Sequence, residues 1–483
     1  MSSRFGNFKR ALTTAGKIVV VVVIIVIVAA GGYIGLTMLG GSSTTSTTTT
    51  TSSTSTTSSS STSTSSSTTT TTSTSHGVQY GPTVTVAMTV SQEGQYASLD
   101  SGYLYLNNAW MSYVNSHGGL VDKNGVHHNV TVITTDDQSN PTTAVQDYHQ
   151  FAEQQGANIL VSPYSADTGL QLLPIAQADH VPIIMSEAST KSMWNGTYTW
   201  AVTPLVPYWS NDTTSAWSAS YFKMLNQTSN QWAHTIAFVG WDITWAIDDY
   251  TSGVWLAEHT NGLTVTSAQL LTPQFTNPDW SSATQQVLAS NGGKSPDIVF
   301  CAMFGPFCAQ FIVYAESHGL TPKQWHTIEW GSAFAGILQQ GGVSTQNITT
   351  DVFWTPSFPT TNFGTSVFNS ITQTANTWAL GNSSTALPVT WYNYQNIEIR
   401  WEIFQMINAT IGQIPSANFS SSTTLDSSIN NVLHHLNIQT ISGPLQIQPA
   451  GYGTMGLVTV QFENGRINTV YPPNVANATY VHP

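Results

Sequence analysis

From Pro82 onward, short runs of β-branched residues alternate with longer segments of helical periodicity along nearly the whole chain. The run VTVAM (84–88) precedes a helical pattern at 98–117, and VTVIT (130–134) precedes another at 142–155. This alternation is typical of parallel α/β architecture, because parallel strands are joined by crossover connections that are usually helices. The sequence therefore predicts parallel sheets flanked by helices.

The same pattern continues towards the C-terminus. Further strands are expected at 158–161, 181–185, 235–240, 263–271, 297–302, 325–329, 351–354, 440–447 and 455–462. Further helices are expected at 169–178, 212–227, 250–260, 279–291, 306–318, 388–411 and 424–436. Because this body of about 400 residues exceeds what one hydrophobic core usually supports, we expect two lobes.

An uncharged apolar run at residues 18–39 precedes the body, and it is long enough to cross a bilayer as a helix. Four cations precede this run, namely Arg4, Lys9, Arg10 and Lys17. The positive-inside rule places residues 1–17 in the cytoplasm and the body outside, so we predict a single-pass membrane anchor. The alternative is a cleaved secretion signal, for which the run is long and lacks a clear A-x-A site.

Residues 40–77 are expected to form a stalk, since residues 42–75 are Ser and Thr without exception. Such a segment cannot bury apolar area to offset its chain entropy, and stalks of this composition are typically O-glycosylated. The body adds nine N-glycosylation sequons, which favour a glycoprotein of the cell surface. They begin at Asn129, Asn195, Asn211, Asn226, Asn347, Asn382, Asn408, Asn418 and Asn477.

The charge balance excludes one class of partner. Beyond the anchor the chain has 7 Lys and Arg residues against 24 acidic residues, so it lacks the basic surface that a nucleic acid requires. Charged residues make up 7% of the whole chain. This scarcity suggests an acidic medium, where few ionised carboxylates remain to need partners.

Cys301 and Cys308 are the two cysteines of the chain. An oxidising compartment allows a disulfide between them. The alternative is that both are free, with Cys301 buried as a small hydrophobe at the end of an apolar run. No spacing typical of a zinc site is present.

Catalytic motifs are poorly represented: there is no G-x-S-x-G elbow, H-E-x-x-H motif or Walker A loop. His127 and His128 precede a strand beside a sequon, where a solvated surface pair is the simplest interpretation. Asp136 and Asp137 follow a strand, where capping or structural hydrogen bonds are expected. We therefore expect neither an enzyme nor a cofactor.

Polar and aromatic residues follow several predicted strands, at the edge where open α/β sheets bind ligands. Hydroxyls and helix N-termini suit a carboxylate, aromatic rings suit an apolar side chain, and a carboxylate suits an ammonium group. Taken singly, such residues are more often helix caps or core edges. The segments are 162–166, 186–190, Trp241 with Asp242, 303–305, and Glu329 with Trp330.

Residues 83–471 resemble the branched-chain amino acid binding proteins of ABC transporters. VTVAMTVSQEGQYASLDSGYLYLNNAWMSYVNSHGGL resembles the first strand, ligand loop and helix of that family, and ILVSPYSADTGLQLLPIAQADHVPIIMSEAST its next strand, Ser-rich loop and helix. IVFCAMFGPFCAQFIVYAESHGL and ISGPLQIQPAGYGTMGLVTVQFENGRINTVYPP follow in the same order. The resemblance implies a two-lobed type I periplasmic-binding-protein fold.

The resemblance also implies roles for individual residues. Tyr96 would border the pocket, the loop at Ser165 and Ala166 together with Ser189 and Thr190 would hold a ligand carboxylate, and Glu329 would meet an ammonium group. Phe304 falls where members often have a tyrosine, and Trp241 begins a longer loop than usual. Ala166 replaces a common serine and Glu187 a proline, so amides, urea-like compounds and short peptides stay open beside branched-chain amino acids.

The implied architecture divides the body at three chain crossings near residues 203, 355 and 442. Lobe 1 would comprise 78–203 and 357–442, and lobe 2 would comprise 204–356 and 443–483. A solute captured by closure of the lobes would then be delivered to an ABC permease in the same membrane.

Two alternatives remain at this stage. The chain could be a surface structural, adhesion or sensory protein that retains the receptor fold without transport, which a cleft filled by its own side chains would favour. An amidase-like enzyme would need a nucleophile with a base, which the sequence does not reveal.

Overall fold

The computed structural model describes residues 78–186, 189–210, 217–228, 232–275, 278–328, 332–355, 358, 364–382, 397–464 and 466–483. The predicted anchor at 18–39 and the stalk at 40–77 lie outside these residues. Within the described residues, no helix is both long enough and apolar enough to span a bilayer.

Lobe 1 is built on a six-stranded sheet in the order β15-β7-β6-β5-β1-β4, in which every neighbouring pair is parallel. The strands β1, β5, β6 and β7 are buried almost throughout because helices cover both faces of the sheet, whereas the edge strands β4 and β15 are only partly buried. Their bounds are β1 (Val84–Val90), β4 (Val130–Asp136), β5 (Ile159–Val161), β6 (Ile183–Ile184), β7 (Ala201–Leu205) and β15 (Tyr452–Met455).

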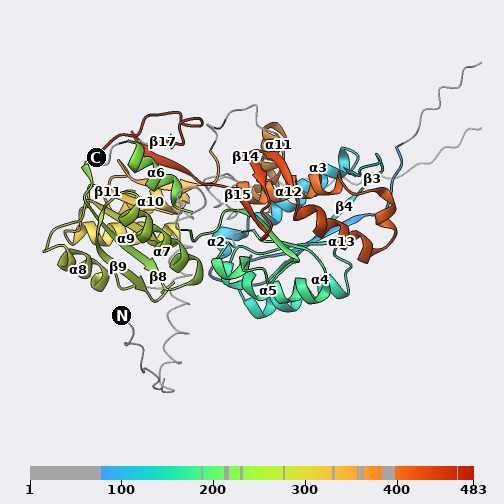
Figure 1. The fold of residues 1–483 in the computed structure, drawn as a ribbon, viewed down its shortest axis with the longest axis horizontal. Helices are drawn as coiled ribbons and strands as arrows, with labels where there is room; N and C mark the ends of the chain where they lie inside the picture. Colours follow the sequence, from blue (N-terminus) through green and yellow to red (C-terminus); the bar gives the residue numbers. More distant parts are fainter. Residues whose placement is uncertain are drawn as a thin grey trace, which may run out of the picture. The chain divides into compact units, whose positions relative to one another are not determined.

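Figure 1 shows α4 and α5 along one side of this sheet and α3, α11 and α12 along the other. The helix α4 starts where Asn140 accepts a hydrogen bond from the backbone N–H of Thr142 and Pro141 occupies the first turn. The helices of the lobe are α2 (Ala97–Asp100), α3 (Tyr103–Ser116), α4 (Pro141–Glu153), α5 (Ala166–Asp179), α11 (Thr365–Asn382), α12 (Ile397–Ile411) and α13 (Ser422–Leu433), with short 3₁₀ turns η2 (Lys191–Trp194) and η4 (Ser416–Ser420).

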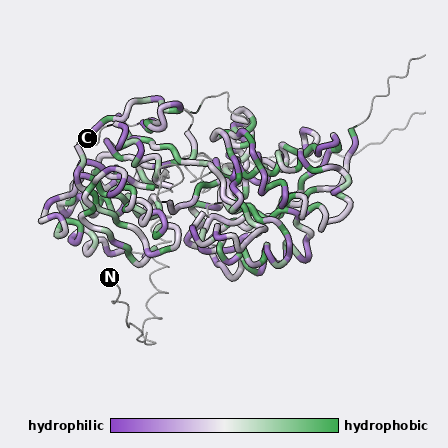
Figure 2. Tube along the Cα trace, in the orientation of Figure 1, coloured by the Kyte–Doolittle hydropathy of each residue, from purple (hydrophilic) through white to green (hydrophobic). Residues whose placement is uncertain are grey.

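Lobe 2 is built on a seven-stranded sheet in the order β17-β16-β12-β11-β10-β8-β9. The last five strands are mutually parallel, whereas β16 and β17 are antiparallel to their neighbours. The strands are β8 (Thr235–Trp241), β9 (Thr264–Leu271), β10 (Ile298–Ala302), β11 (Gln324–Thr327), β12 (Thr349–Val352), β16 (Val458–Glu463) and β17 (Arg466–Tyr471). The helices are α6 (Ala219–Gln227), α7 (Thr244–His259), α8 (Ser281–Ser290), α9 (Gly305–Ser317) and α10 (Ser332–Gln340). In Figure 2 hydrophobic residues are concentrated in the interior of each lobe, and many hydrophilic residues lie on its outside.

The chain passes between the lobes after β7, after β12 and between β15 and β16. The crossing predicted near residue 442 is therefore wrong, because β15 still pairs with β7 in lobe 1. Gly453 makes this late pairing possible: a Cβ atom there would lie 2.1 Å from the carbonyl oxygen of Pro204. Residues 451–456 have the G-x-G-x-x-G spacing of dinucleotide sites, yet they form a strand and not a strand-to-helix turn.

Several elements escaped prediction. The strand β7 contains Pro204, a residue that is rare within sheets, and β17, α10 and α11 were not expected either. The strand predicted at 440–447 is a hairpin of β13 (Asn437–Thr440) and β14 (Gly443–Gln446), with Gly443 at φ 109° at the turn. The remaining strands are the antiparallel pair β2 (Leu120–Val121) and β3 (His127–His128).

Candidate functional site

A small cavity lies where residues from the two lobes meet. Lobe 1 contributes Tyr96, Tyr164, Ser165, Ala166 and Asp167 to its wall. The other wall residues are Tyr208, Trp217, Trp245, Phe304 and Ile328. The enclosed volume is about 20 Å³, which is room for roughly one water molecule.

The lobe 1 wall is formed by two loops that follow neighbouring strands. The loop after β1 leads to Tyr96, directly before α2, and the loop after β5 leads to Tyr164 and Ser165. Ser165 caps α5, since its Oγ accepts a hydrogen bond from the backbone N–H of Thr168 at 3.4 Å. The hydroxyl of Ser165 therefore serves the helix as well as the cavity.

The lobe 2 wall is formed in the same way at the ends of parallel strands. Phe304 follows β10 and directly precedes α9, Ile328 follows β11, and Trp245 lies in the first turn of α7. Trp241, the last residue of β8, is buried behind Phe304 with ring centroids 5.3 Å apart. This layer supports the wall but does not line the cavity.

Three rings meet across the two lobes. The ring centroids of Tyr96, Tyr164 and Phe304 are 6.0 to 6.1 Å apart, with Tyr96 edge-on to Phe304. Aromatic pairs at this spacing stabilise by about 0.5–1.5 kcal/mol beyond their buried area. In this structure the three rings therefore pack against one another between the two lobes.

Asp167 is the single charged side chain among the described residues of the wall. Burial raises the pKa of Tyr96, a hydrogen bond with Ser165 opposes this, and the negative charge of Asp167 adds to the increase. The cavity thus combines aromatic faces, one carboxylate and hydroxyl groups.

Among the described residues, hydrogen bonds to two aspartates join the lobes beside the cavity. Thr244 Oγ1 of α7 donates to Asp167 Oδ1 of α5 at 2.7 Å, and the backbone N–H of Lys191 donates to Asp248 Oδ2 at 2.7 Å. Burial raises the pKa of Asp248, while the Lys191 N–H and ammonium oppose the increase. Both bonds are broken if the lobes separate.

The structure places some of the predicted site residues at the cavity and others away from it. Tyr96, Ser165, Ala166 and Phe304 line the cavity, but Ser189, Thr190 and Trp241 are not among its lining residues. Glu329 lies outside the described residues.

The two predicted hydroxyls have partners elsewhere. Ser189 Oγ accepts a hydrogen bond from Trp194 Nε1 at 3.2 Å, and Thr190 Oγ1 lies 3.1 Å from Ser192 Oγ. The loop that carries them leads into η2, and Trp194 of η2 donates the hydrogen bond to Ser189. Each hydroxyl has both a donor and two acceptor sites, so these contacts leave hydrogen-bonding capacity, and the assignment of a carboxylate-binding pair to Ser189 and Thr190 stays a prediction.

Sequence reasoning did not assign Asp167, Tyr208, Trp217, Trp245 and Ile328 to the wall, and it gave Tyr164 no role of its own although the segment 162–166 contains it. Asp167 directly follows that segment, so a window one residue longer would have included it. Trp217 and Trp245 lie in or before helices, where no local pattern separates a wall residue from a core residue.

A larger hollow of about 470 Å³ lies on lobe 1 alone, between α3, α11 and α12. Trp110 and Phe404 stack along it with centroids 4.2 Å apart, and Asn408 of a predicted sequon is at its edge. All of its described lining residues belong to lobe 1, so it differs from the small cavity, which is lined from both lobes.

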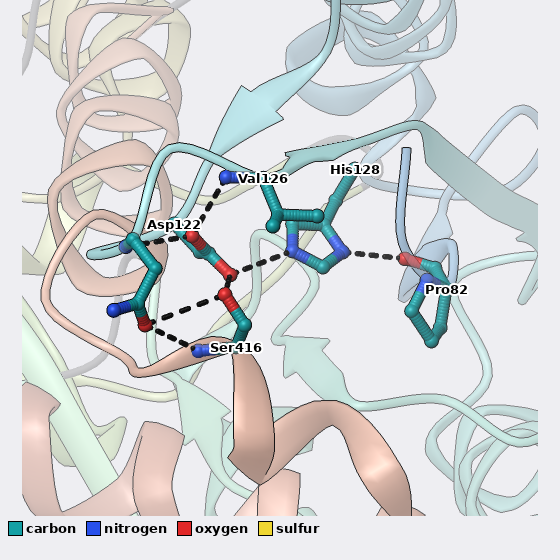
Figure 3. Close-up of polar contacts among 6 residues, drawn as sticks. Pro82, Asp122, Val126, His128 and Ser416 are labelled. Carbon is teal, nitrogen blue, oxygen red and sulfur yellow. Dashed lines mark hydrogen bonds and ion pairs between the residues drawn. The ribbon is translucent and has the colours of Figure 1, made fainter. Parts of the chain in front are cut away.

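The histidine pair is not a solvated surface pair, so that prediction is wrong. His128 is fully buried, with Nδ1 2.7 Å from Pro82 O and Nε2 3.3 Å from Asp122 Oδ2 (Figure 3). Ser416 donates to the same carboxylate and not to the imidazole (Figure 3). Both ring nitrogens are thus occupied, and this Asp, His and Ser group is not a nucleophile with its base.

Asp137 has the structural role that was expected. Its carboxylate accepts hydrogen bonds from Thr89 Oγ1 and Ser91 Oγ, both at 2.6 Å, and from the Ser139 N–H at 2.9 Å. Asp136 Oδ1 accepts from two backbone N–H groups in the same loops. These bonds hold the turn after β4 against the loop after β1.

Within the described ranges, one group of residues has its metal-ligating atoms close together, namely His149, Glu153 and Asp179, within 4.8 Å. His149 Nδ1 lies 3.3 Å from Asp179 Oδ2, which links α4 to α5. His149 and Glu153 are exposed, and an ion pair between two helices accounts for the arrangement.

Cys301 and Cys308 form a disulfide, with their sulfur atoms 2.21 Å apart. The bonded alternative therefore applies. Among the sequons, Asn129, Asn195, Asn226, Asn408 and Asn477 are exposed. Asn347 and Asn418 are half-buried, and the side chains of Asn211 and Asn382 lie outside the described residues.

Solved structures share this fold over most of the chain. An ABC transporter substrate-binding protein of Aeropyrum pernix matches with 15% identity and a TM-score of 0.63, covering 82% of this chain and 97% of its own. The branched-chain amino acid transporter substrate-binding protein LivJ of Streptococcus pneumoniae, in complex with isoleucine, matches with 12% identity and a TM-score of 0.56, covering 80% and 97%. An ABC transporter solute-binding protein of Rhodopseudomonas palustris, in complex with 4-hydroxybenzoate, matches with 17% identity and a TM-score of 0.57, covering 80% and 95%. No curated protein sequence matches this chain.

The family model described as periplasmic binding protein matches residues 83–384, which is well over half of the chain. This match agrees with the two α/β lobes and with a cavity lined from both of them. It also agrees with the expectation that the chain binds a ligand and is not an enzyme. The chain belongs to the periplasmic binding protein family.

Proposed function

We propose that this protein is the extracellular solute receptor of an ABC importer and captures a small ligand in the cavity between its lobes. The observation that carries the proposal is the cavity wall, which combines loops from the strand ends of both sheets. A wall shared by two lobes is completed when the lobes close. A partner protein can then recognise the ligand-bound state by its different arrangement of the lobes.

The cavity of about 20 Å³ requires the lobes to open before a ligand enters. Opening breaks the Thr244–Asp167 and Lys191–Asp248 hydrogen bonds and separates Phe304 from the tyrosines of lobe 1. When the lobes close again, both hydrogen bonds re-form and the ligand adds contacts of its own to the rings. An ABC permease in the same membrane is the proposed recipient of the closed form.

The location follows from the N-terminal sequence. We propose that residues 18–39 anchor the protein, that the Ser and Thr stalk holds the body outside the cell, and that exposed sequons such as Asn129 and Asn477 carry glycans. The excess of acidic over basic residues in the body argues against a nucleic-acid partner and agrees with a location outside the cell.

The test is calorimetric titration of the full chain in detergent micelles with leucine, isoleucine, phenylalanine, 4-hydroxybenzoate and a dipeptide. A tryptophan placed at Ala166 fills the cavity, so Ala166→Trp should abolish binding. Ala178→Trp is the matched control, because Ala178 is exposed on the same helix α5 and should leave binding unchanged. Binding that survives Ala166→Trp would locate the ligand elsewhere and refute the proposed site.

A second candidate function is favoured by the small volume of the cavity. A cleft filled by its own rings suits a surface structural, adhesion or sensory protein that keeps the receptor fold without transport. Such a protein keeps its lobes together. Small-angle scattering of the full chain distinguishes the two, since a transport receptor changes its radius of gyration when ligand is added and a rigid surface protein does not.

A further inference from the structure

The described residues of the cavity wall carry one negative charge and no positive charge. Among the described residues it contains six aromatic side chains and the carboxylate of Asp167, and no lysine, arginine or histidine. The basic residue of the nearby η2 turn, Lys191, has its ammonium 3.6 Å from the centroid of the Trp209 ring, so this charge already has an aromatic partner. An anionic ligand would therefore meet no cation in the described wall.

Aromatic faces attract cations, because the ring quadrupole places negative potential above and below the ring. A carboxylate adds to the same attraction. Alkylated ammonium groups suit such a wall best, since they are weakly hydrated and also bury apolar surface against the rings. The wall chemistry thus favours an organic cation over a zwitterion that needs a carboxylate receptor.

The described part of the wall also contains a buried hydrogen-bond donor without a partner. Trp217 lines the cavity, and its indole Nε1 is buried without a hydrogen-bond partner among the described residues. A buried donor without a partner is unfavourable, and an oxygen atom of a ligand would satisfy it. The ligand is therefore expected to carry one acceptor oxygen near its cationic group.

We propose that the cavity binds a small organic cation with an alkylated ammonium group and one acceptor oxygen. The ammonium lies between Tyr96, Tyr164 and Phe304, where opening of the lobes makes room, and faces Asp167. The oxygen accepts from Trp217. This inference rests on the proposed function, because it names the ligand class of the same site.

The test compares two ligands of the same shape and different charge. Choline and its neutral carbon isostere 3,3-dimethyl-1-butanol are titrated calorimetrically into the full chain, with leucine as the amino-acid comparison. We expect choline to bind at least tenfold more tightly than the alcohol and than leucine. Raising the salt concentration should weaken choline more than the alcohol, because only choline interacts with the charge of Asp167.

Variants assign the effect to the wall. Asp167→Asn should weaken choline at least fivefold and leave the alcohol unchanged, and Asp167→Glu should restore part of the affinity. Phe304→Leu should weaken choline by removing a ring face while keeping apolar volume. Asp242→Asn is the matched control, since Asp242 is exposed after β8 and does not line the cavity. Thermal melts of each variant show whether it is folded.

The outcomes separate this inference from the proposed function. If leucine binds more tightly than choline, or if the alcohol binds as tightly as choline, the cation assignment is overturned and the receptor function stands. If choline, leucine and the other solutes named above all fail to bind the folded protein, the receptor function fails with it. Choline binding that is insensitive to both Asp167→Asn and Phe304→Leu also overturns the assignment.

Discussion

We expect two buried carboxyl groups on α12 to make the stability of this protein dependent on pH. Glu398 and Glu402 lie one turn apart and are almost inaccessible to solvent. Burial raises the pKa of Glu398 to about 8, against hydrogen bonds that include the backbone N–H of Phe353 and with a contribution from Glu402. Burial likewise raises the pKa of Glu402 to about 7. Both side chains are therefore protonated in the folded protein at mildly acidic pH.

The direction of the effect follows from proton linkage. Between the ordinary glutamate pKa of 4.5 and a folded value of about 8, the folded protein holds a proton on Glu398 that the unfolded chain has lost. The free energy of unfolding then falls as the pH rises, by about 1.4 kcal/mol per pH unit for this group. Over the interval this amounts to roughly 5 kcal/mol. Burial also raises the pKa of Asp100 to about 7 and of Asp249 to about 8, which acts in the same direction.

We therefore expect Glu398→Gln to reduce the pH dependence of the free energy of unfolding by the contribution of this one group. The amide resembles the protonated acid and does not titrate, so the variant should match the parent near pH 4.5 and exceed its stability at pH 8. The assay is urea unfolding of the full chain, followed by tryptophan fluorescence at half-unit pH steps. Asp242→Asn serves as control, because this exposed carboxyl should leave the slope unchanged. A parent protein that is less stable at pH 4.5 than at pH 7, or a variant with the parental slope, would refute the reasoning.

Three further predictions concern packing and lobe contact. Phe304→Ala should lower the free energy of unfolding by about 3–5 kcal/mol, since the ring is buried among others, and urea titration measures this. Gly453→Ala should destabilise by about 3 kcal/mol, because the new methyl group meets the carbonyl of Pro204; equal melting temperatures would contradict it. Thr244→Val removes the hydrogen bond to Asp167 and should weaken ligand binding about fivefold, through a loss of about 1 kcal/mol in the closed form; calorimetry measures the change, and unaltered affinity would exclude a role for this bond in closure.

Much of the fold could be predicted because parallel strands buried on both faces read as continuous apolar runs. The strands β1, β4, β8 and β10 begin and end within a few residues of their expected positions. The strand β7 was missed because Pro204 interrupts its β-branched pattern. The strand β15 could not be assigned to lobe 1, because it pairs with β7 at Gly453, which lies some 250 residues after β7 in the sequence.

Prediction of the site was less complete. Loops at strand ends identified Tyr96, Ser165 and Phe304, since the carboxyl edge of a parallel sheet is where such loops gather. The roles given to Ser189 and Thr190 stay predictions, since neither residue lines the cavity in this structure, and nothing local in the sequence shows that Trp194 donates a hydrogen bond to Ser189. His128 was expected at the surface, although Asp122 and Pro82 bury both of its nitrogens.

The sequence by itself determined the α/β class, the likeness to the receptor family and the N-terminal segment that precedes the body, because periodicity and composition are local properties of the chain. The tertiary structure alone decided which rings face one another, how little space they leave and which charge lies beside them. Tyr208, Trp217 and Trp245 join the wall through contacts between segments that are distant in sequence. Side-chain partners of that kind depend on the packing of the lobes, and packing is a property of the folded chain as a whole.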